Sequence, residues 1–161
     1  MKPNRTLSNL VTITMLVALL LTSTTATAIA ELPSKEDLDQ KARQSIAIYA
    51  SSEEFLNIPY VYCGSSTNGF DCSGFVQYIY AHFGYTLERT TKYQKNMGAE
   101  IIGMENLLPG DLVFFRNFHH VGIYLGNNEF VHASSGSGKV VISSLAEGYY
   151  YDHYSGARRI F

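Results

Sequence analysis

The sequence predicts an α+β fold, in which helices come first along the chain and an antiparallel sheet follows. Apolar residues recur at helical spacing in two segments of the first half, 35–50 and 72–83. Short β-rich runs bounded by Asn, Gly and Ser fill the second half, from about residue 107. Helices followed by strands, without βαβ alternation, is the order expected of an α+β domain.

The first thirty residues are predicted to be a secretory signal peptide, which takes no part in the fold. A basic start precedes an apolar run of twelve residues, 10–21, and small residues follow it. Two A-x-A patterns predict cleavage after Ala28 or Ala30. The run is too short to span roughly 30 Å of hydrocarbon. We therefore expect an exported protein, periplasmic or secreted, with no membrane attachment after cleavage.

Residues 31–161 are predicted to form a single domain with one core. Removing the signal segment leaves ten basic and fourteen acidic side chains, a net charge of −4 with histidines neutral. A mildly acidic chain without a basic run is not expected to bind nucleic acid. We also expect no cofactor, and a monomer.

The first helix is predicted to begin at Ser34. Asp37 lies three residues further on, as in a capping box. One stripe of this helix carries the apolar positions Leu38, Ala42, Ile46 and Tyr49.

The second helix is predicted to begin after Asp71 and to end near Gly84. Its apolar stripe contains Val76, Ile79, Tyr80 and Phe83. A loop rich in Gly, Asn and Ser precedes it. Cys72 therefore falls in the first turn of this helix.

Two interpretations of Cys72 are open from the pattern alone. A helix N-terminus favours the thiolate, which is the nucleophilic form of cysteine. Ser73 and Gly74 are small, so their backbone N–H groups are expected to be open to a substrate oxyanion. Alternatively, position 72 lies one helical turn before Val76 and so continues the apolar stripe. The thiol would then be a buried, inert core residue.

Cys63 allows two further alternatives. Export permits a disulfide between Cys63 and Cys72. A metal site built from both cysteines and the histidines is disfavoured, because Cys-x8-Cys lacks the short pair spacing typical of zinc sites.

Four runs in the second half predict a meander of antiparallel strands: "LPGDLVFF", "HVGIYLG", "EFVHAS" and "KVVISSL". His120 and His132 lie on two consecutive runs. A nucleophilic thiol needs an imidazole beside it, which a third polar group orients. His82 and His153 are expected to be structural or surface residues.

The register between these two strands decides whether the histidines can meet. A three-residue loop 126–128 pairs position 120 with 134, so His120 and His132 share a face at roughly 7–8 Å. A two-residue turn at 127–128 sends them to opposite faces. A catalytic pair therefore requires the loop or a bulge to supply an odd residue. His119 is then expected to point to the other side of the sheet.

Several motifs resemble those of the NlpC-type cell-wall cysteine peptidases: "IPYVYCG", "FDCSGFVQYIY", "LLPGDLVFF" and "HVGIYLGNNEFVHAS". The resemblance runs from about Tyr60 to Ser134 in the same order. It implies a papain-like domain, with a helix carrying the cysteine packed on a curled antiparallel sheet that carries the base.

The resemblance also implies roles for individual residues. Cys72 matches the nucleophile, His120 the general base and His132 the residue that orients the base. Tyr60 matches a tyrosine that helps to hold the oxyanion. Arg89 opens a segment, "RTTKYQ", that resembles one lining the cleft. With Ser73 beside the nucleophile, these residues form the predicted site, and no metal is expected.

Members of this family hydrolyse amide bonds in the peptide stems of peptidoglycan, after D-γ-glutamyl or at diaminopimelate cross-links. The resemblance therefore implies a secreted endopeptidase acting through an acyl-enzyme. A cysteine amidase or acyltransferase with another substrate, and a catalytically silent wall-binding domain, remain alternatives.

The chain departs from the family pattern at Cys63-Gly64, where relatives usually show Gly-Gly. The cysteine side chain is expected to narrow the cleft. It also suggests the hypothesis that a Cys63–Cys72 disulfide switches the protein off under oxidation.

Overall fold

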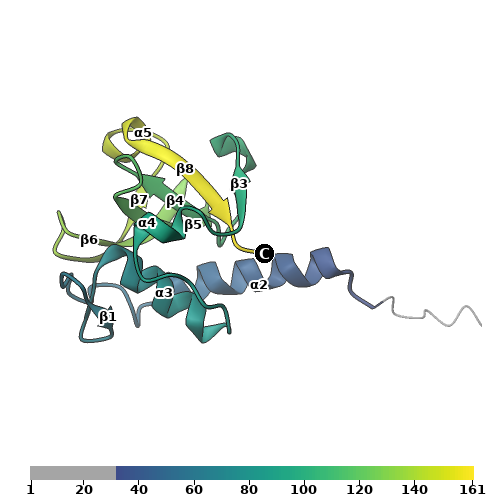
Figure 1. Ribbon diagram of the computed structural model, residues 1–161, viewed down its shortest axis with the longest axis horizontal. Coiled ribbons are helices and arrows are strands. Elements are labelled where there is room, and N and C mark those ends of the chain that lie inside the picture. Colours follow the sequence, from purple (N-terminus) through teal and green to yellow (C-terminus); the bar gives the residue numbers. More distant parts are fainter. Residues whose placement is uncertain (1–31) are drawn as a thin grey trace, which may run out of the picture. The chain divides into compact units, whose positions relative to one another are not determined.

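The computed structural model describes residues 32–161, of which Ser34–Phe161 form one compact unit (Figure 1). The predicted signal segment and its cleavage site lie outside the described residues. No helix within residues 32–161 has the length and apolar character needed to cross a membrane. In chain order the elements are α2 (Lys35–Ala50), β1 (Ser65–Ser66), β2 (Gly69–Phe70), α3 (Cys72–His82), α4 (Thr91–Gln94), β3 (Ala99–Ile101), η1 (Met104–Asn106), β4 (Leu112–Phe115), β5 (His120–Gly126), β6 (Glu129–Ser134), β7 (Lys139–Ser144), α5 (Tyr149–Asp152) and β8 (Tyr154–Arg159).

The main sheet has six antiparallel strands in the order β3-β8-β4-β5-β6-β7. The meander from β4 to β7 confirms the predicted strands, and the α+β class is confirmed. Strand β8 was not predicted; it returns to pair with β4, and β3 then pairs with β8. The two long helices, α2 and α3, lie together on one side of this sheet (Figure 1).

Helix α2 begins at the predicted capping box. The Ser34 hydroxyl accepts a hydrogen bond from the Asp37 amide at 3.1 Å, and the Asp37 carboxylate accepts one from the Ser34 amide at 3.1 Å. The predicted stripe is wrong at its first position, because Leu38 is 52% exposed. Only the second half of α2 packs into the core, through Ile46 and its neighbours.

Helix α3 begins and ends as predicted. The Asp71 carboxylate accepts a hydrogen bond from the Gly74 amide at 2.7 Å, which caps the first turn. Gly84, with φ of +82°, follows the last turn in the left-handed conformation that favours glycine. Phe75, Val76 and Ile79 of α3 are fully buried.

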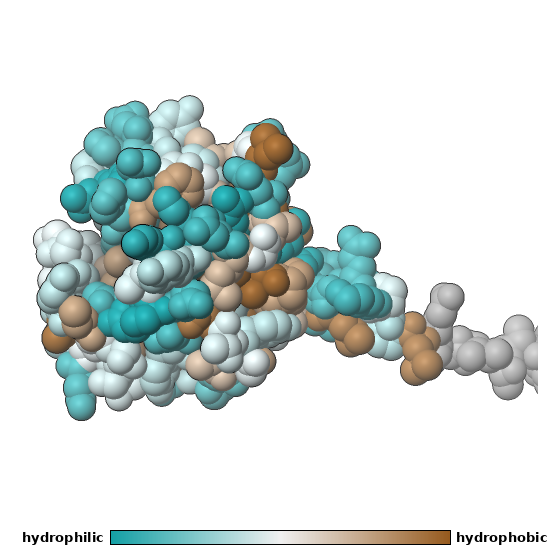
Figure 2. All heavy atoms as spheres, viewed as in Figure 1, coloured by the Kyte–Doolittle hydropathy of each residue, from teal (hydrophilic) through white to brown (hydrophobic). Residues whose placement is uncertain are grey.

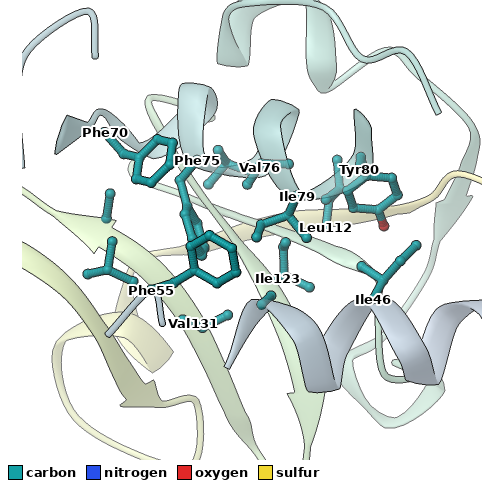
Figure 3. Packing of buried hydrophobic residues seen from close by; sticks show 14 of the residues in the cluster. Ile46, Phe55, Phe70, Phe75, Val76, Ile79, Tyr80, Leu112, Ile123 and Val131 are labelled. Atoms are coloured by element: carbon teal, nitrogen blue, oxygen red, sulfur yellow. The ribbon is translucent and has the colours of Figure 1, made fainter. Parts of the chain in front are cut away.

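These α3 side chains pack against α2 and the near face of the sheet (Figure 3). Ile46 comes from α2, whereas Ile123 and Val131 come from β5 and β6. The far face of the sheet has its own buried cluster, which includes Phe115, Tyr124 and Phe130. Figure 2 shows mainly hydrophilic and neutral residues on the visible outer face of the domain.

A bulge sets the register between β5 and β6. Ile123 pairs with Val131 and Tyr124 with Phe130, but Gly126 pairs with Glu129, so Leu125 is the extra residue. The loop itself has only two residues, at 127–128, both in the left-handed region. The prediction of a three-residue loop is therefore wrong, and the bulge supplies the odd residue, which was the other possibility. This pairing keeps positions 120 and 132 on the same face.

Candidate active site

Cys72 is the first residue of α3 and is partly buried. The backbone N–H groups of Val121, Ser73 and Cys72 itself each lower the pKa of its thiol, so they lie close to the sulfur. The Val121 N–H belongs to the peptide that joins His120 to Val121. The thiol therefore sits where the N-terminus of α3 meets the start of β5. This arrangement brings the predicted nucleophile beside the strand that begins at the predicted base.

The protonation state of Cys72 differs from the prediction. Burial raises the pKa of the Cys72 thiol above that of a free cysteine. The Val121 N–H group lowers this pKa, the Asp71 carboxylate raises it, and the net direction is upward. The expectation that the helix N-terminus favours the resting thiolate is therefore wrong, because removal from water outweighs the N–H groups.

The side chains of His120 and His132 are hydrogen-bonded to each other. The Nε2 atom of His120 lies 2.7 Å from the Nδ1 atom of His132, and both residues are buried. On its other side, His132 Nε2 lies 3.0 Å from the Ser143 hydroxyl oxygen. The bulge between β5 and β6 permits this contact, since it places both rings on one face.

Both imidazoles are neutral at neutral pH. Burial, and secondarily the charge of Arg116, lowers the pKa of His120 to about 4. Burial, and secondarily His120, lowers the pKa of His132 to about 3. For His120 Nδ1 to accept a proton, its Nε2 must carry the hydrogen and donate it to His132 Nδ1. His132 then donates its Nε2 hydrogen to the Ser143 hydroxyl.

Tyr150 continues this polar chain. Its pKa is raised by burial, while hydrogen bonds from the hydroxyls of Ser134 and Ser143 act in the opposite direction. The Tyr150 ring also lies 5.1 Å from the His132 ring, at 75°. The Ser143 hydroxyl can accept from His132, as the tautomer just described requires. Sequence reasoning missed both Ser143 and Tyr150, which lie beyond the recognised motifs.

A cleft of about 490 Å³ opens beside the thiol. We call it the Cys72 cleft; its lining comprises Tyr60, Tyr62, Cys63, Asp71, Cys72, Ser73, Arg89, Thr90, Thr91 and His119. The structure thus brings four predicted residues, Tyr60, Cys72, Ser73 and Arg89, to one cavity.

Tyr60 is fixed on one wall of the cleft. Its amide donates to the Gly138 carbonyl at 2.8 Å, and its segment forms a bridge with Phe70. Burial raises the pKa of the Tyr60 phenol, with a further contribution from Cys72. The phenol therefore stays protonated and is able to donate a hydrogen bond.

Arg89 holds the start of α3. Its guanidinium donates to both carboxylate oxygens of Asp71, at 2.9 and 2.7 Å, and to the Ser73 hydroxyl at 3.1 Å. The Ser73 hydroxyl in turn donates to Asp71 at 3.1 Å. A Cβ on Gly74 would lie only 2.1 Å from the Gly64 carbonyl oxygen, so glycine is required at this position.

These contacts correct one expectation. The Gly74 N–H group is not open to a substrate oxyanion, because it already caps on Asp71 at 2.7 Å. The Ser73 side chain is likewise committed to Asp71 and Arg89. The backbone N–H groups that lower the pKa of the Cys72 thiol are those of Val121, Ser73 and Cys72.

Cys63 and Cys72 are both free thiols in the structure. Cys63 is exposed in the lining of the Cys72 cleft, with φ of +60°. This left-handed conformation is one that glycine adopts without strain, in agreement with the glycine of the resembled motif. Within residues 32–161, no three His, Cys, Asp or Glu side chains are grouped so that they could hold a metal ion.

The remaining histidines occupy different environments. His119 is exposed, lines the Cys72 cleft and has its Nδ1 atom 2.8 Å from the Arg116 carbonyl oxygen. It belongs to the turn before β5 and not to the sheet, and sequence reasoning gave it no place in the cleft. His82 stacks on Tyr49 at 4.2 Å, and His153 on Tyr149 at 4.1 Å, which agrees with structural or surface positions.

Comparison with known proteins agrees with this geometry. Residues 57–159 match the sequence model of the NlpC/P60 family. The chain is 44% identical over 115 residues to a probable endopeptidase NlpC homolog from Haemophilus influenzae, covering 71% of this chain and 62% of the relative. It is 47% identical over 111 residues to murein DD-endopeptidase MepS/murein LD-carboxypeptidase from Escherichia coli K12, covering 66% of this chain and 58% of the relative.

Solved structures show the same fold. An NlpC/P60 family protein from Bacillus cereus superposes with a TM-score of 0.68 at 33% identity, covering 80% of this chain and 43% of that one. The peptidoglycan hydrolase RipB from Mycobacterium tuberculosis gives a TM-score of 0.66 at 27% identity, covering 91% and 77%. The chain spans about three-fifths of the length of the curated relatives it matches. On its motifs, its fold and these matches, the chain belongs to the NlpC/P60 family.

Proposed function

We propose that this protein is an exported cysteine endopeptidase that hydrolyses amide bonds in the peptide stems of peptidoglycan. The observation that carries the proposal is the buried hydrogen-bonded chain His120–His132–Ser143. Its first residue, His120, directly precedes Val121, whose backbone N–H group lowers the pKa of the Cys72 thiol. A neutral imidazole that a second imidazole orients is the arrangement expected of a base that activates a thiol. Family relatives support the substrate class, since they include murein and peptidoglycan endopeptidases.

In the proposed reaction, the Cys72 sulfur attacks the carbonyl carbon of the scissile amide. Because the resting thiol is neutral, its proton passes to His120 as the S–C bond forms. The resulting imidazolium is stabilised by its Nε2 contact with His132. Tyr60 and the backbone amides beside the sulfur are positioned to donate to the oxyanion.

His120 then returns the proton to the leaving amine as the C–N bond breaks, which leaves an acyl group on the sulfur. A water molecule, deprotonated by His120, attacks this thioester and releases a carboxylic acid and the free thiol. Arg89 and Asp71 act as positioning residues, since they fix the first turn of α3 without reaching the sulfur.

The finer specificity follows the relatives. Their names include a γ-D-glutamyl-L-lysine dipeptidyl-peptidase, 38% identical over 111 residues, and the murein DD-endopeptidase already described. We propose cleavage either after D-γ-glutamyl or at a diaminopimelate cross-link. Export through the predicted signal segment 1–30 brings the protein to this substrate.

Mass spectrometry of peptidoglycan digests tests the proposal. Purified sacculi and isolated stem peptides are incubated with the native protein, with Cys72→Ala and with Cys63→Gly. We expect new amine termini with the native protein and Cys63→Gly, and none with Cys72→Ala. Products from Cys72→Ala at the native rate, or retention of the protein on sacculi without any released peptide, would reject an endopeptidase. Transfer of the acyl group to an added amine, without hydrolysis, would identify an acyltransferase instead.

A further inference from the structure

A second cavity, of about 270 Å³, borders His120. We call it the Arg116 pocket; it is lined by Arg116 and His120, by the loop 134–137, and by Tyr149 and Tyr150. It shares no lining residue with the Cys72 cleft. Its size suits one amino-acid residue of a longer ligand more than a complete ligand.

The pocket has the chemistry of an anion site. Its lining contains one permanent cation, Arg116, and no Asp or Glu. Within residues 32–161, the Arg116 guanidinium makes no ion pair and no side-chain hydrogen bond. The serine hydroxyls at positions 135 and 137 and two tyrosines supply further donors. A planar guanidinium among hydroxyl donors matches the two oxygens of a carboxylate.

The backbone that carries Arg116 is held in a strained shape. Arg116, Asn117 and Phe118 all have positive φ, at 54°, 54° and 63°, although none is glycine. The Arg116 amide donates to the His153 carbonyl at 2.9 Å, and the Asn117 amide to the Ser155 hydroxyl at 2.8 Å. Backbone strain of this kind persists only where surrounding contacts fix it, and it is concentrated at functional sites.

Phe118 anchors the end of this turn. Its ring packs against Phe114 at 5.6 Å and over Gly156, where a Cβ would come within 3.3 Å of the ring. The ammonium of Lys95 lies over the same ring, 5.2 Å from its centroid. Contacts from β4, from β8 and from Lys95, the residue after α4, therefore hold the turn that carries Arg116.

The same turn joins the two cavities. Arg116 lines one cavity, His119 lines the Cys72 cleft, and His120 follows as the first residue of β5. In the proposed reaction His120 delivers its proton to the leaving amine, so groups beyond that amine extend toward the His120 side. Arg116 already acts on this histidine electrostatically, as the second cause of its lowered pKa.

We propose that the Arg116 pocket binds a free carboxylate on the amine side of the scissile bond, so that the enzyme selects peptides with an anionic leaving portion. This inference rests on the proposed function. Arg116 pairs with the carboxylate through its guanidinium fork, and the hydroxyls around it complete the coordination. The Cys72 cleft then holds the acyl portion, and His120 stands between the two.

Two peptides that differ only in charge test the inference. One is L-Ala-γ-D-Glu-meso-diaminopimelyl-D-Ala; the other has both free carboxyl groups of the diaminopimelyl-D-Ala portion converted to amides. For the native protein we expect kcat/KM to be at least about 10-fold higher for the acid, mainly through KM. Arg116→Gln should lose this preference by slowing the acid alone, and Arg116→Lys should keep part of it. Lys41→Gln, which removes an exposed charge from α2, is the matched control and should keep the full preference.

A binding measurement separates this inference from the proposed function. The leaving product, meso-diaminopimelyl-D-Ala, and its amide are titrated into Cys72→Ala and into Cys72→Ala/Arg116→Gln. We expect at least about 10-fold tighter binding of the acid only where Arg116 is present. If the native protein cleaves neither these peptides nor cross-linked sacculi yet this difference appears, the proposed function fails while the carboxylate site stands. Equal affinity for acid and amide, or an equal loss of both on Arg116→Gln, would overturn the carboxylate site.

Discussion

His132 is held between two partners, with its Nδ1 atom 2.7 Å from His120 and its Nε2 atom 3.0 Å from the hydroxyl of Ser143. The second contact allows His132 to carry its hydrogen on Nε2, because the Ser143 hydroxyl can accept it. If Nε2 donates to Ser143, Nδ1 is free to accept from His120. Ser143 is therefore a positioning residue for the base, although it lies on β7, one strand further from the thiol.

Ser143→Ala should lower kcat about 10-fold and leave KM nearly unchanged, because the lost hydrogen bond supports the imidazolium pair only as charge develops. The measurement is steady-state cleavage of a stem peptide. Ser143→Thr keeps a hydroxyl and should restore most of the rate. Nitrogen NMR of the histidines adds a readout that a packing defect alone would not give, namely a changed tautomer of His132. Native kinetics in Ser143→Ala would contradict the assignment.

Gly122→Ala should destabilise the fold by about 1–3 kcal/mol, as expected for overpacking. A Cβ at this position would lie 2.6 Å from the Phe130 ring, 2.8 Å from the Val131 carbonyl oxygen and 3.1 Å from the His132 Cβ. The glycine therefore gives the room that the histidine pair needs. Urea unfolding gives the free energy, and Gly136→Ala is the control, because its Cβ would meet only one atom, at 3.9 Å. An equal effect of the two substitutions would contradict this explanation.

Alkylation of Cys72 should require alkaline pH, since burial raises its pKa. In a Cys63→Gly protein, which removes the competing thiol, the iodoacetamide rate should reach half its maximum above the pH found for a free thiol such as glutathione, about 8.5. Mass spectrometry from pH 5 to 10 follows the reaction. A rate that is already maximal near pH 6 would show a resting thiolate and contradict the neutral pair.

Stability should fall as the solution is acidified from about pH 6.5 toward pH 4. An unfolded histidine takes up a proton with a pKa near 6.5, whereas His120 and His132 do so in the folded protein only at about 4 and 3. The unfolded state therefore binds more protons in this window, and each histidine contributes a loss of up to about 1.4 kcal/mol per pH unit. Their contribution is fully present above pH 6.5. Urea unfolding of the native protein and of His132→Gln should show the steeper loss in the native protein; parallel curves would contradict it.

Local signals in the sequence predicted the helices and the meander correctly. The capping residues Ser34 and Asp71 fix both helix starts because each bonds to backbone within three residues. The prediction that an odd residue between β5 and β6 puts His120 and His132 on one face was also correct. A bulge at Leu125 supplies that residue in place of a three-residue loop. Such a choice depends on backbone geometry at a Gly-Asn-Asn turn that residue types alone do not distinguish.

Strand β8 escaped prediction because it lacks alternation. Only Ala157 of its six residues is buried, and Arg159 reaches the interior by pairing with the fully buried Asp111, at 2.7 Å. That pair joins positions 48 residues apart. The direction of the Cys72 pKa shift could not be read from the helix start either, because it depends on how fully β5 encloses the sulfur.

Little in the sequence indicates that Arg116 belongs to a site. It stands between two apolar runs, four residues before His120, in a segment that reads only as a turn. Three consecutive left-handed residues bring its side chain into the pocket beside His120, and no propensity scale anticipates that conformation.

Trapping the acyl-enzyme tests the central claim most directly. A stem peptide is mixed with the native protein, quenched in acid at times shorter than one turnover, and the protein is digested and sequenced by mass spectrometry. We predict a transient mass increase equal to the acyl portion of the substrate, confined to the sulfur of Cys72 and absent from Cys72→Ala. Turnover without any adduct at Cys72, or an adduct that forms on Cys63 alone, would contradict the account.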